Sequence, residues 1–430
     1  MKVLLIGSGG REHALAWKIA QSPFLSQLIC APGNPGTASL DKTENIDIKA
    51  NDIDGLVSYA AGNDIDLVVV GPEEPLVLGI TDRMKEAGIK VFGPSKAASQ
   101  LEGSKAFMKD LLAKAGVPTA FYGRFTDIET ATQFIKENGA PIVVKTDGLA
   151  AGKGVIICET EEDAVQAATD MLSGTSFGDA GAEVVIEEFL EGEEISFFAL
   201  CDGQTVLPLT SAQDHKRAFD NDEGPNTGGM GAYSPAHVMT NRIEEIIIRD
   251  HLEPTLKTMA AEGYPFTGVL FAGLMLTKDG PKMLEYNIRF GDPECQALML
   301  RMEGDLLDIL DKAAETRLSE VLTDISWSKD PSICVVMATK GYPGPYQKGS
   351  VIQGLSQIKA AQVFHAGTAL DDKGNLLAVG GRVLNVCAKA DDLERARDRA
   401  YSALKQIDWP DGFYRKDIGW RAFCKEQKAS

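Results

Sequence analysis

The first hundred residues alternate short apolar segments with amphipathic ones, and this alternation constrains the fold more than any other feature of the chain. Buried strands that alternate with helices are typical of a doubly wound parallel sheet. We therefore predict an α/β fold (α+β overall) that begins with such a sheet. The expected strands are Lys2–Ile6, Leu28–Ala31, Leu67–Val70 and Lys90–Phe92, and the expected helices are Glu12–Ala20, Ile53–Ala61 and Ile80–Ala87.

Three loops rich in glycine or proline follow these strands: GSGGRE at Gly7–Glu12, PGNPG at Pro32–Gly36 and GPEEP at Gly71–Pro75. The carboxyl ends of parallel strands meet at one edge of a sheet, and ligands of such sheets bind beyond that edge. The three loops therefore predict a binding site there.

The loop after the first strand admits three interpretations. Bare backbone N–H groups at a helix start can hold the phosphate of a sugar phosphate, through Gly9, Gly10 and Arg11. A dinucleotide fingerprint fits poorly, because Glu12 stands where the third glycine belongs. An ordinary strand-to-helix turn is the third interpretation.

Composition excludes several classes of protein. A chain of 430 residues predicts two to four domains, and its net charge of −19 argues against binding nucleic acid or an anionic membrane. The seven cysteines are scattered, which predicts reduced thiols, and no apolar run has the length of a signal peptide or a membrane span. We expect a cytoplasmic protein.

The segment KTDGLAAGKG, Lys145–Gly154, is one residue short of a Walker A loop and lacks its Ser or Thr. It lies between two expected strands, Pro141–Thr146 and Gly154–Cys158. A glycine-rich flap of this kind can fold over nucleotide phosphates, with Lys145 neutralising their charge. A flexible hairpin with a solvated lysine is the alternative.

Two further segments carry acidic residues. In Val184–Phe197, Glu187 and Glu194 border a junction between strands, which is either an acidic surface turn or a nucleotide-binding hinge. In KMLEYNIRFGDPE, the period of two of a strand places Glu285, Asn287 and Arg289 on one face. A carboxylate and an amide oxygen suit Mg²⁺, and the arginine suits a phosphate or a carboxylate.

The long polar segment 211–235 contains Asp214, Lys216 and Gly229, and loops of this length are usually functional or disordered. No Ser-His-Asp, Cys-His or zinc arrangement offers a competing catalytic centre.

Together these segments resemble the ATP-grasp superfamily and, more closely, its phosphoribosylamine–glycine ligase family. The likeness covers essentially the whole chain. It rests on segments 7–18, 32–37, 71–76, 92–109 (FGPSKAASQLEGSKAFMK), 143–155 (VVKTDGLAAGKGV), 213–220 (QDHKRAFD), 224–235 (GPNTGGMGAYSP) and 285–296 (EYNIRFGDPECQ), and on the terminal signature RKDIGWRA at 415–422.

The resemblance implies a fold of four parts. These are a phosphoribosyl-binding domain at 1–103, a mobile ATP-grasp lid with a linker helix at 104–192, a catalytic subdomain at 193–330, and a small mixed α/β domain at 331–430. It also implies ligation of glycine to 5-phosphoribosylamine, with ATP as co-substrate and glycyl phosphate as intermediate, in de novo purine biosynthesis. The expected protein is a monomer or weak dimer, in transient contact with the enzyme that supplies phosphoribosylamine.

The resemblance further implies roles for individual residues. Catalysis would involve Lys145, Arg289 and Asp214. ATP would be bound by Lys105, Lys145, Gly152, Lys153, Gly154, Glu187, Leu190 and Glu194. The other substrates would be bound by Gly9, Gly10, Arg11, Asn34, Glu73, Asp214, Lys216, Gly229, Arg289, Asp292, Pro293 and Glu294. Mg²⁺ or Mn²⁺ would be bound by Glu285 and Asn287.

One departure concerns the metal. Many ATP-grasp enzymes carry a third acidic ligand on the preceding strand, where this chain has Gly273, Leu274 and Met275, so the number of metal ions stays open. Three rival functions remain: another ATP-grasp ligase or carboxylase, which the loops at Gly7 and Gly71 argue against, a non-catalytic nucleotide sensor, and a nicotinamide oxidoreductase.

Overall fold

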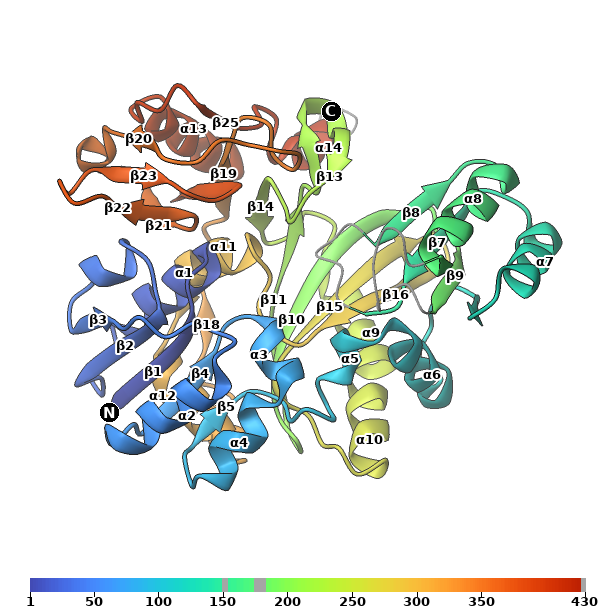
Figure 1. The fold of residues 1–430 in the computed structure, drawn as a ribbon, viewed down its shortest axis with the longest axis horizontal. Helices are drawn as coiled ribbons and strands as arrows, with labels where there is room; N and C mark the ends of the chain where they lie inside the picture. Colours follow the sequence, from blue (N-terminus) through green and yellow to red (C-terminus); the bar gives the residue numbers. More distant parts are fainter. Residues whose placement is uncertain (149–153, 174–182, 427–430) are drawn as a thin grey trace.

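The structure is a computed structural model that describes residues 1–148, 154–173 and 183–426. A long central sheet runs through the molecule (Figure 1). The N-terminal sheet lies against one side of it, a small lid sheet lies at one end, and the C-terminal part lies above the N-terminal sheet. None of the described helices combines the length and the apolar character needed to cross a membrane.

The N-terminal sheet has the strand order β3-β2-β1-β4-β5, and all its pairings are parallel, which confirms the predicted doubly wound sheet. Its strands are β1 (Lys2–Gly7), β2 (Gln27–Pro32), β3 (Thr43–Asn45), β4 (Leu67–Val70) and β5 (Val91–Phe92). Its helices are α1 (Gly10–Ile19), α2 (Ile53–Gly62), α3 (Glu73–Leu78) and α4 (Ile80–Glu86).

The lid is an antiparallel sheet of order β6-β9-β7-β8, with its own apolar core. The predicted flap strands pair as expected, and β9 pairs with the other side of β7. Its strands are β6 (Tyr122–Phe125), β7 (Ile142–Thr146), β8 (Val155–Cys158) and β9 (Val184–Glu188), and its helices are α7 (Ile128–Asn138) and α8 (Glu161–Leu172). Two helices, α5 (Gln100–Gly103) and α6 (Lys105–Ala115), connect it to the N-terminal sheet.

The central sheet has the order β16-β15-β10-β11-β14-β19-β24-β21, so it continues across the expected boundary at residue 330. The junction is β14, which pairs with β11 on one side and with β19 on the other. The strands are β10 (Glu193–Asp202), β11 (Val206–Asp214), β14 (Gly231–Ser234), β15 (Thr267–Thr277), β16 (Gly280–Asn287), β19 (Ser332–Thr339), β21 (Gln362–His365) and β24 (Arg382–Lys389).

The remaining elements are helices, 3₁₀ turns and short strands outside this strand order. The predicted helix Ile243–Met259 is continuous, but a π-helical turn, Ile248–Leu252, joins its two α-helical parts. The long polar segment contains a hairpin, β12 (Arg217–Phe219) and β13 (Glu223–Asn226). The other elements are α9 (Asn241–Ile247), α10 (Glu253–Ala261), α11 (Glu294–Arg301), α12 (Leu306–Ala314), α13 (Leu393–Leu404), α14 (Trp420–Glu426), β17 (Met302–Glu303), β18 (Ser326–Trp327), β20 (Ser350–Ile352), β22 (Thr368–Leu370), β23 (Leu376–Ala378), β25 (Gly412–Phe413) and 3₁₀ turns at Thr37–Ser39, Asp220–Asp222, Leu318–Glu320 and Leu355–Gln357.

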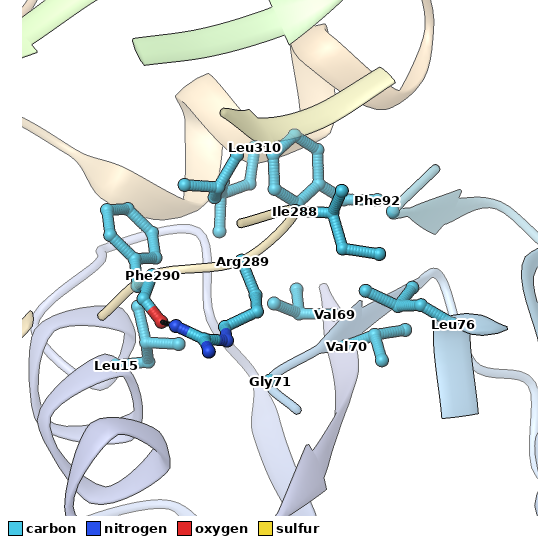
Figure 2. Close-up of a pocket in the computed structure, with 12 residues that line it drawn as sticks. Leu15, Val69, Val70, Gly71, Leu76, Phe92, Ile288, Arg289, Phe290 and Leu310 are labelled. Carbon is cyan, nitrogen blue, oxygen red and sulfur yellow. Dashed lines mark hydrogen bonds between the residues drawn. The ribbon is translucent and has the colours of Figure 1, made fainter. Parts of the chain in front are cut away.

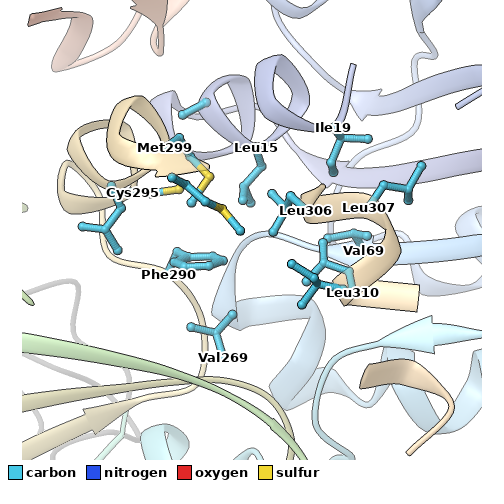
Figure 3. Packing of buried hydrophobic residues seen from close by; sticks show 14 of the residues in the cluster. Leu15, Ile19, Val69, Val269, Phe290, Cys295, Met299, Leu306, Leu307 and Leu310 are labelled. Carbon is cyan, nitrogen blue, oxygen red and sulfur yellow. The ribbon is translucent and has the colours of Figure 1, made fainter. Parts of the chain in front are cut away.

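One apolar core joins the N-terminal sheet to the central sheet. Figure 3 shows Leu15 of α1, Met299 of α11 and Leu310 of α12 directed toward one another, with Val69 of β4 beside them. These side chains are almost fully buried, which stabilises the contact by the hydrophobic effect. The core thereby fixes the carboxyl edge of the N-terminal sheet against the end of β16.

Candidate active site

The loops after β1 and β4 meet the end of β16 at this junction. The sequence predicts that these loops share one edge of the sheet, but not that β16 reaches it. The Arg11 guanidinium donates to the Phe290 carbonyl at 3.1 Å, and the Arg289 guanidinium lies 3.2 Å from the Glu73 carboxylate. Arg11 also lies 3.9 Å from Glu73. Residues far apart in the sequence therefore form one charged cluster.

Arg289 is the centre of this cluster. Its guanidinium also pairs with Glu102 at 3.0 Å and donates to the Asn287 side-chain oxygen at 3.1 Å. Burial by itself would raise the pKa of Glu73, but Arg289 and Arg11 outweigh it and lower this pKa to about 2. Glu73 is therefore ionised at neutral pH. The sequence analysis did not identify Glu102 as a site residue. It is the third residue of the short helix α5, and its neighbours in the sequence give no sign of a site.

An apolar pocket adjoins the cluster. Figure 2 shows Val69, Val70, Leu76 and Phe92 around it, with the Arg289 side chain between them and Phe290. The pocket thus has aliphatic and aromatic walls and one cationic side chain.

Glu12, in the first turn of α1, has a structural role in the loop after β1. In the sequence analysis it counted only as a departure from the dinucleotide fingerprint. Glu12 accepts from the Gly9 N–H at 2.7 Å and from Arg11 Nε at 2.5 Å. A β-carbon built on Gly7 or Gly71 would lie 2.4 Å or 2.3 Å from Glu12 atoms. Glycine is required at both positions because this buried side chain occupies the space. A Glu at the third helical position after the cap is a capping-box signal, which could have indicated this.

Asn34 and Gly10 face the C-terminal part of the chain. The Asn34 amide donates to the Ser8 carbonyl at 2.8 Å and to the His365 carbonyl at 3.0 Å. A β-carbon on Gly10 would lie 2.2 Å from the Asn385 side-chain nitrogen. Both residues therefore hold the loop edge against β21 and β24, and their contacts with a substrate stay predictions.

Three lysines, Lys105, Lys109 and Lys145, lie where the lid meets the body. Lys145 lies 3.0 Å from the Glu187 carboxylate, whose other oxygen lies 2.9 Å from Lys109. Lys105 donates to the Gly148 carbonyl at 3.1 Å, and burial lowers its pKa. The Glu187 side chain thus faces lysines, while its backbone lies inside the lid sheet, where it is in register with Tyr122 of β6 and Val143 of β7. Lys109 was missed, because it reads as an ordinary position of the α6 helix.

The remaining ATP residues lie around the junction of β9 and β10. Leu190 is buried there, and the Glu194 carboxylate pairs with Lys216 of the body. Gly154 begins the described segment after the glycine loop, where its carbonyl accepts from the Thr146 N–H at 2.9 Å. Gly152 and Lys153 lie outside the described residues.

Glu285 and Asn287 have the character of metal ligands. Burial alone would raise the pKa of Glu285, but Lys216, Lys145 and Lys105 lower it, so the carboxylate is ionised. No cation of the described segments lies within ion-pairing distance of it. Gly273 stands opposite Glu285 in register, and a β-carbon there would lie 3.3 Å from Glu285 Cγ.

The described segments contain no group of three or more His, Cys, Asp or Glu side chains suited to a metal. A carboxylate and an amide oxygen fit a Mg²⁺ ion that completes its shell with phosphate oxygens and water. The donor set therefore fits the expected metal when a nucleotide is present.

Asp214 and Glu294 form a second group of acidic residues at the site. Burial is the main cause that raises the pKa of Asp214 to about 8; Lys216 opposes this shift, and Glu294 and Glu194 contribute to it. Glu294 accepts from the Ser196 hydroxyl at 3.2 Å. The Asp214 carboxyl group can therefore exchange a proton near neutral pH.

The Asp292–Pro293 turn is held by the C-terminal part of the chain. Arg382 donates to the Asp292 carbonyl at 2.6 Å. Gly229 packs against Pro293 with a φ of +105°, and a β-carbon there would lie 2.5 Å from Pro293 Cδ. Glycine is therefore required at 229 for both conformation and space.

A small lid sheet with a buried lysine, joined to a long central sheet that carries Glu285, is the arrangement of an ATP-grasp protein. Comparison with known protein families shows which ATP-grasp family the chain belongs to. The Phosphoribosylglycinamide synthetase N domain matches residues 1–102, its ATP-grasp (A) domain matches 103–295, and its C domain matches 332–421.

Relatives match over the whole length of the chain. A protein of Brucella melitensis named phosphoribosylamine–glycine ligase is 57% identical over 99% of both chains, and one of that name from Vibrio parahaemolyticus is 54% identical over 100% of both. The crystal structure of the Thermotoga maritima ligase superposes with a TM-score of 0.85 at 31% identity, covering 97% of this chain and 100% of that one. The chain belongs to the phosphoribosylglycinamide synthetase family, which confirms the resemblance seen in the sequence.

A more distant likeness concerns the fold alone. The biotin carboxylase domain of Hydrogenobacter thermophilus 2-oxoglutarate carboxylase has a TM-score of 0.71 at 20% identity, over 96% of this chain and 91% of that one. The ATP-grasp arrangement is thus shared beyond the family.

Proposed function

We propose that the chain ligates glycine to 5-phosphoribosylamine and converts ATP to ADP and phosphate, with glycinamide ribonucleotide as product, in de novo purine biosynthesis. The observation that carries this proposal is the 57% identity over 99% of both chains to a protein named for that ligation. The likeness spans all the segments that meet at Arg289, so it includes the substrate side as well as the ATP side.

The lid side is suited to ATP. The buried Lys145 and the half-buried Lys105 can neutralise the phosphates, together with the loop residues Gly152, Lys153 and Gly154. The hinge that Glu187 and Leu190 mark can bind adenine, and Glu194 can bind ribose by exchanging its contact with Lys216.

Glu285 and Asn287 would hold Mg²⁺ or Mn²⁺, which when bound neutralises and orients the phosphates. The residues of this chain then determine the alignment. Lys145 of the lid and Arg289 of the body both act on the Glu285 carboxylate, so a phosphoryl group and a carboxylate could be held near these two cations.

The opposite side is suited to the other substrates. The loop residues Gly9, Gly10, Arg11, Asn34 and Glu73 would bind the ribosyl phosphate and sugar. Glycine would be bound by Arg289 through its carboxylate and by an acid through its ammonium. The other acidic and loop residues assigned to this region are Asp214, Lys216, Gly229, Asp292, Pro293 and Glu294.

The chemistry proceeds in two steps. A glycine carboxylate oxygen attacks the γ-phosphorus and ADP leaves, which gives glycyl phosphate. The amine nitrogen of phosphoribosylamine then attacks the carbonyl carbon, inorganic phosphate leaves, and the nitrogen loses a proton. The raised pKa of Asp214 suits a group that accepts this proton. Water must be excluded so that glycyl phosphate is not hydrolysed.

We expect the protein to act in the cytoplasm, as a monomer or weak dimer in transient contact with the enzyme that supplies phosphoribosylamine. The test is mass-spectrometric detection of glycinamide ribonucleotide from purified protein with all three substrates. A nucleotide sensor would bind ATP without releasing ADP under these conditions. An ATP-grasp carboxylase would require bicarbonate in place of glycine for ADP release.

A further inference from the structure

Lys109, Glu187 and Lys145 form a buried charged cluster where the lid sheet meets helix α6. Their side chains are 0%, 2% and 9% exposed, and they come from α6, β9 and β7. One carboxylate oxygen of Glu187 pairs with Lys109 at 2.9 Å and the other with Lys145 at 3.0 Å. We call these three residues the lysine–glutamate cluster.

Lys109 ties this cluster to the body of the protein. Its ammonium donates to the Thr119 hydroxyl at 2.7 Å, and this hydroxyl donates to the Met283 carbonyl at 2.6 Å. Met283 lies on β16, two residues before Glu285. The position of Glu187, and through it Lys145, is therefore fixed relative to the strand that carries the predicted metal ligands.

The charges of the cluster do not balance. Two lysines share one carboxylate, so the cluster carries one excess positive charge when all three groups are ionised. The nearby Glu285 carboxylate offsets this charge in part but makes no ion pair with either lysine. A buried charge without a close partner is costly, and an anion that reaches it is bound more strongly than in water. Lys145 is the more exposed of the two lysines, so the excess charge is more accessible at Lys145 than at Lys109. Burial lowers the pKa of Lys109 to about 8, with Lys145 adding to this effect and Glu187 opposing it.

We propose that Lys109 is a positioning residue for the phosphate site, which engages Glu187 so that Lys145 is oriented and keeps one positive charge available for the β- and γ-phosphates of ATP. Lys109 acts without touching the nucleotide, because its ammonium is enclosed by Glu187, Thr119 and the ring of Tyr122, whose centroid lies 5.9 Å away. The inference rests on the proposed function, in that it takes ATP as the ligand.

The test compares nucleotide binding by calorimetry in four proteins: wild type, Lys109→Met, the double variant Lys109→Met/Glu187→Gln, and Lys114→Met. Lys114 lies on the same helix and also pairs with a glutamate, but its side chain is 58% exposed, so Lys114→Met is the matched control. The probes are AMP-PNP with Mg²⁺, and adenosine, which lacks phosphates.

Lys109→Met leaves Glu187 to neutralise Lys145 completely, so its affinity for AMP-PNP should fall about tenfold while its affinity for adenosine is unchanged. The double variant again carries one positive charge, so it should bind AMP-PNP several-fold more tightly than Lys109→Met, although Lys145 has lost its contact with the Glu187 carboxylate. Lys114→Met should match wild type with both probes. Lys109→Arg should keep most of the affinity, which provides a second variant if Lys109→Met folds poorly.

Two results would overturn the inference. One is equal affinity of wild type and Lys109→Met for AMP-PNP. The other is a double variant that binds AMP-PNP no better than Lys109→Met, which would mark the role of Lys109 as structural only. Failure of wild type itself to bind AMP-PNP would overturn the proposed function together with the inference.

Discussion

Lys145 lies at the end of a lid strand, away from the main apolar cores, so its removal tests function with little effect on folding. Lys145→Ala should lower the ligation rate by about 10²–10³, because one preorganised charge contact in the transition state is lost. The measurement is ADP release with saturating substrates, with circular dichroism as the check on folding. Lys136→Ala, an exposed lysine of the lid helix α7, should retain full activity. Comparable rates for Lys145→Ala and wild type would remove Lys145 from the phosphate site.

Glu285 offers a second test at the same scale. Glu285→Gln removes the negative charge of a predicted metal ligand but keeps its shape, so activity should fall by about tenfold or more and be partly restored by excess Mg²⁺. The measurement is a Mg²⁺ titration of the ligation rate. Asp279→Asn, in the exposed turn between β15 and β16, is the control. An unchanged Mg²⁺ dependence in Glu285→Gln would contradict the assignment.

At the scale of elements, the C-terminal signature holds the hairpin β12–β13 in place. The fully buried Arg415 pairs with Asp417 at 2.8 Å and with Asp222 at 2.9 Å, and it donates to the Arg217 carbonyl at 3.0 Å. The hairpin follows directly after Asp214 and Lys216. The segment that carries these two residues is therefore fixed between the site and the C-terminal segment.

Arg415→Met should lower the free energy of unfolding by about 3 kcal/mol, because the partly buried Asp417 carboxylate loses its partner and Asp222 keeps only Arg421. Urea denaturation measures this. Arg395→Met, whose side chain is 64% exposed and pairs with Asp391 and Asp392, should change stability by less than about 1 kcal/mol. Equal losses in the two variants would argue against the buried contact as the source of the stability.

Local patterns predicted the elements better than their partners. The strands of the N-terminal sheet and the flap pair β7–β8 follow from apolar segments and glycine loops, and the structure confirms them. The short strand β14, with sequence GAYS, has no such pattern, because its pairing with β11 and β19 is long-range. The continuity of the central sheet was therefore not foreseeable.

The same limit applies to the site. The motifs identified Lys145, Glu73 and Arg289, because residue type and spacing suggest their chemistry. Lys109 and Glu102 were missed, since nothing near them in the sequence shows that a carboxylate or a guanidinium from another element lies within 3 Å or so of them.

At the scale of the whole molecule, two histidines join the N-terminal helix α1 to the C-terminal strand β21. The His365 N–H donates to His13 Nδ1 at 2.8 Å. Burial, with a smaller effect of His365, lowers the pKa of His13 to about 3, and burial lowers that of His365 to about 4. Both rings are therefore neutral in the folded protein.

The unfolded chain takes up protons at these histidines below about pH 6.5, whereas the folded chain does not until about pH 3–4. Stability is therefore lost as the pH falls through this window, by about 1.4 kcal/mol per pH unit for each histidine. His13→Gln should reduce the slope of unfolding free energy against pH by about that amount between pH 4.5 and 6. Urea denaturation across this range is the measurement, and identical slopes for wild type and His13→Gln would contradict the account.

The most direct test of the proposed ligation follows the oxygen atoms of glycine. The purified protein is supplied with ATP, phosphoribosylamine and glycine labelled with ¹⁸O in both carboxylate oxygens, and the product and the released phosphate are analysed by mass spectrometry. The account predicts glycinamide ribonucleotide that retains one label and inorganic phosphate that carries the other, because the carboxylate oxygen that attacks the γ-phosphorus leaves with it. Product formed with unlabelled phosphate would exclude glycyl phosphate, and absence of the product would contradict the ligation itself.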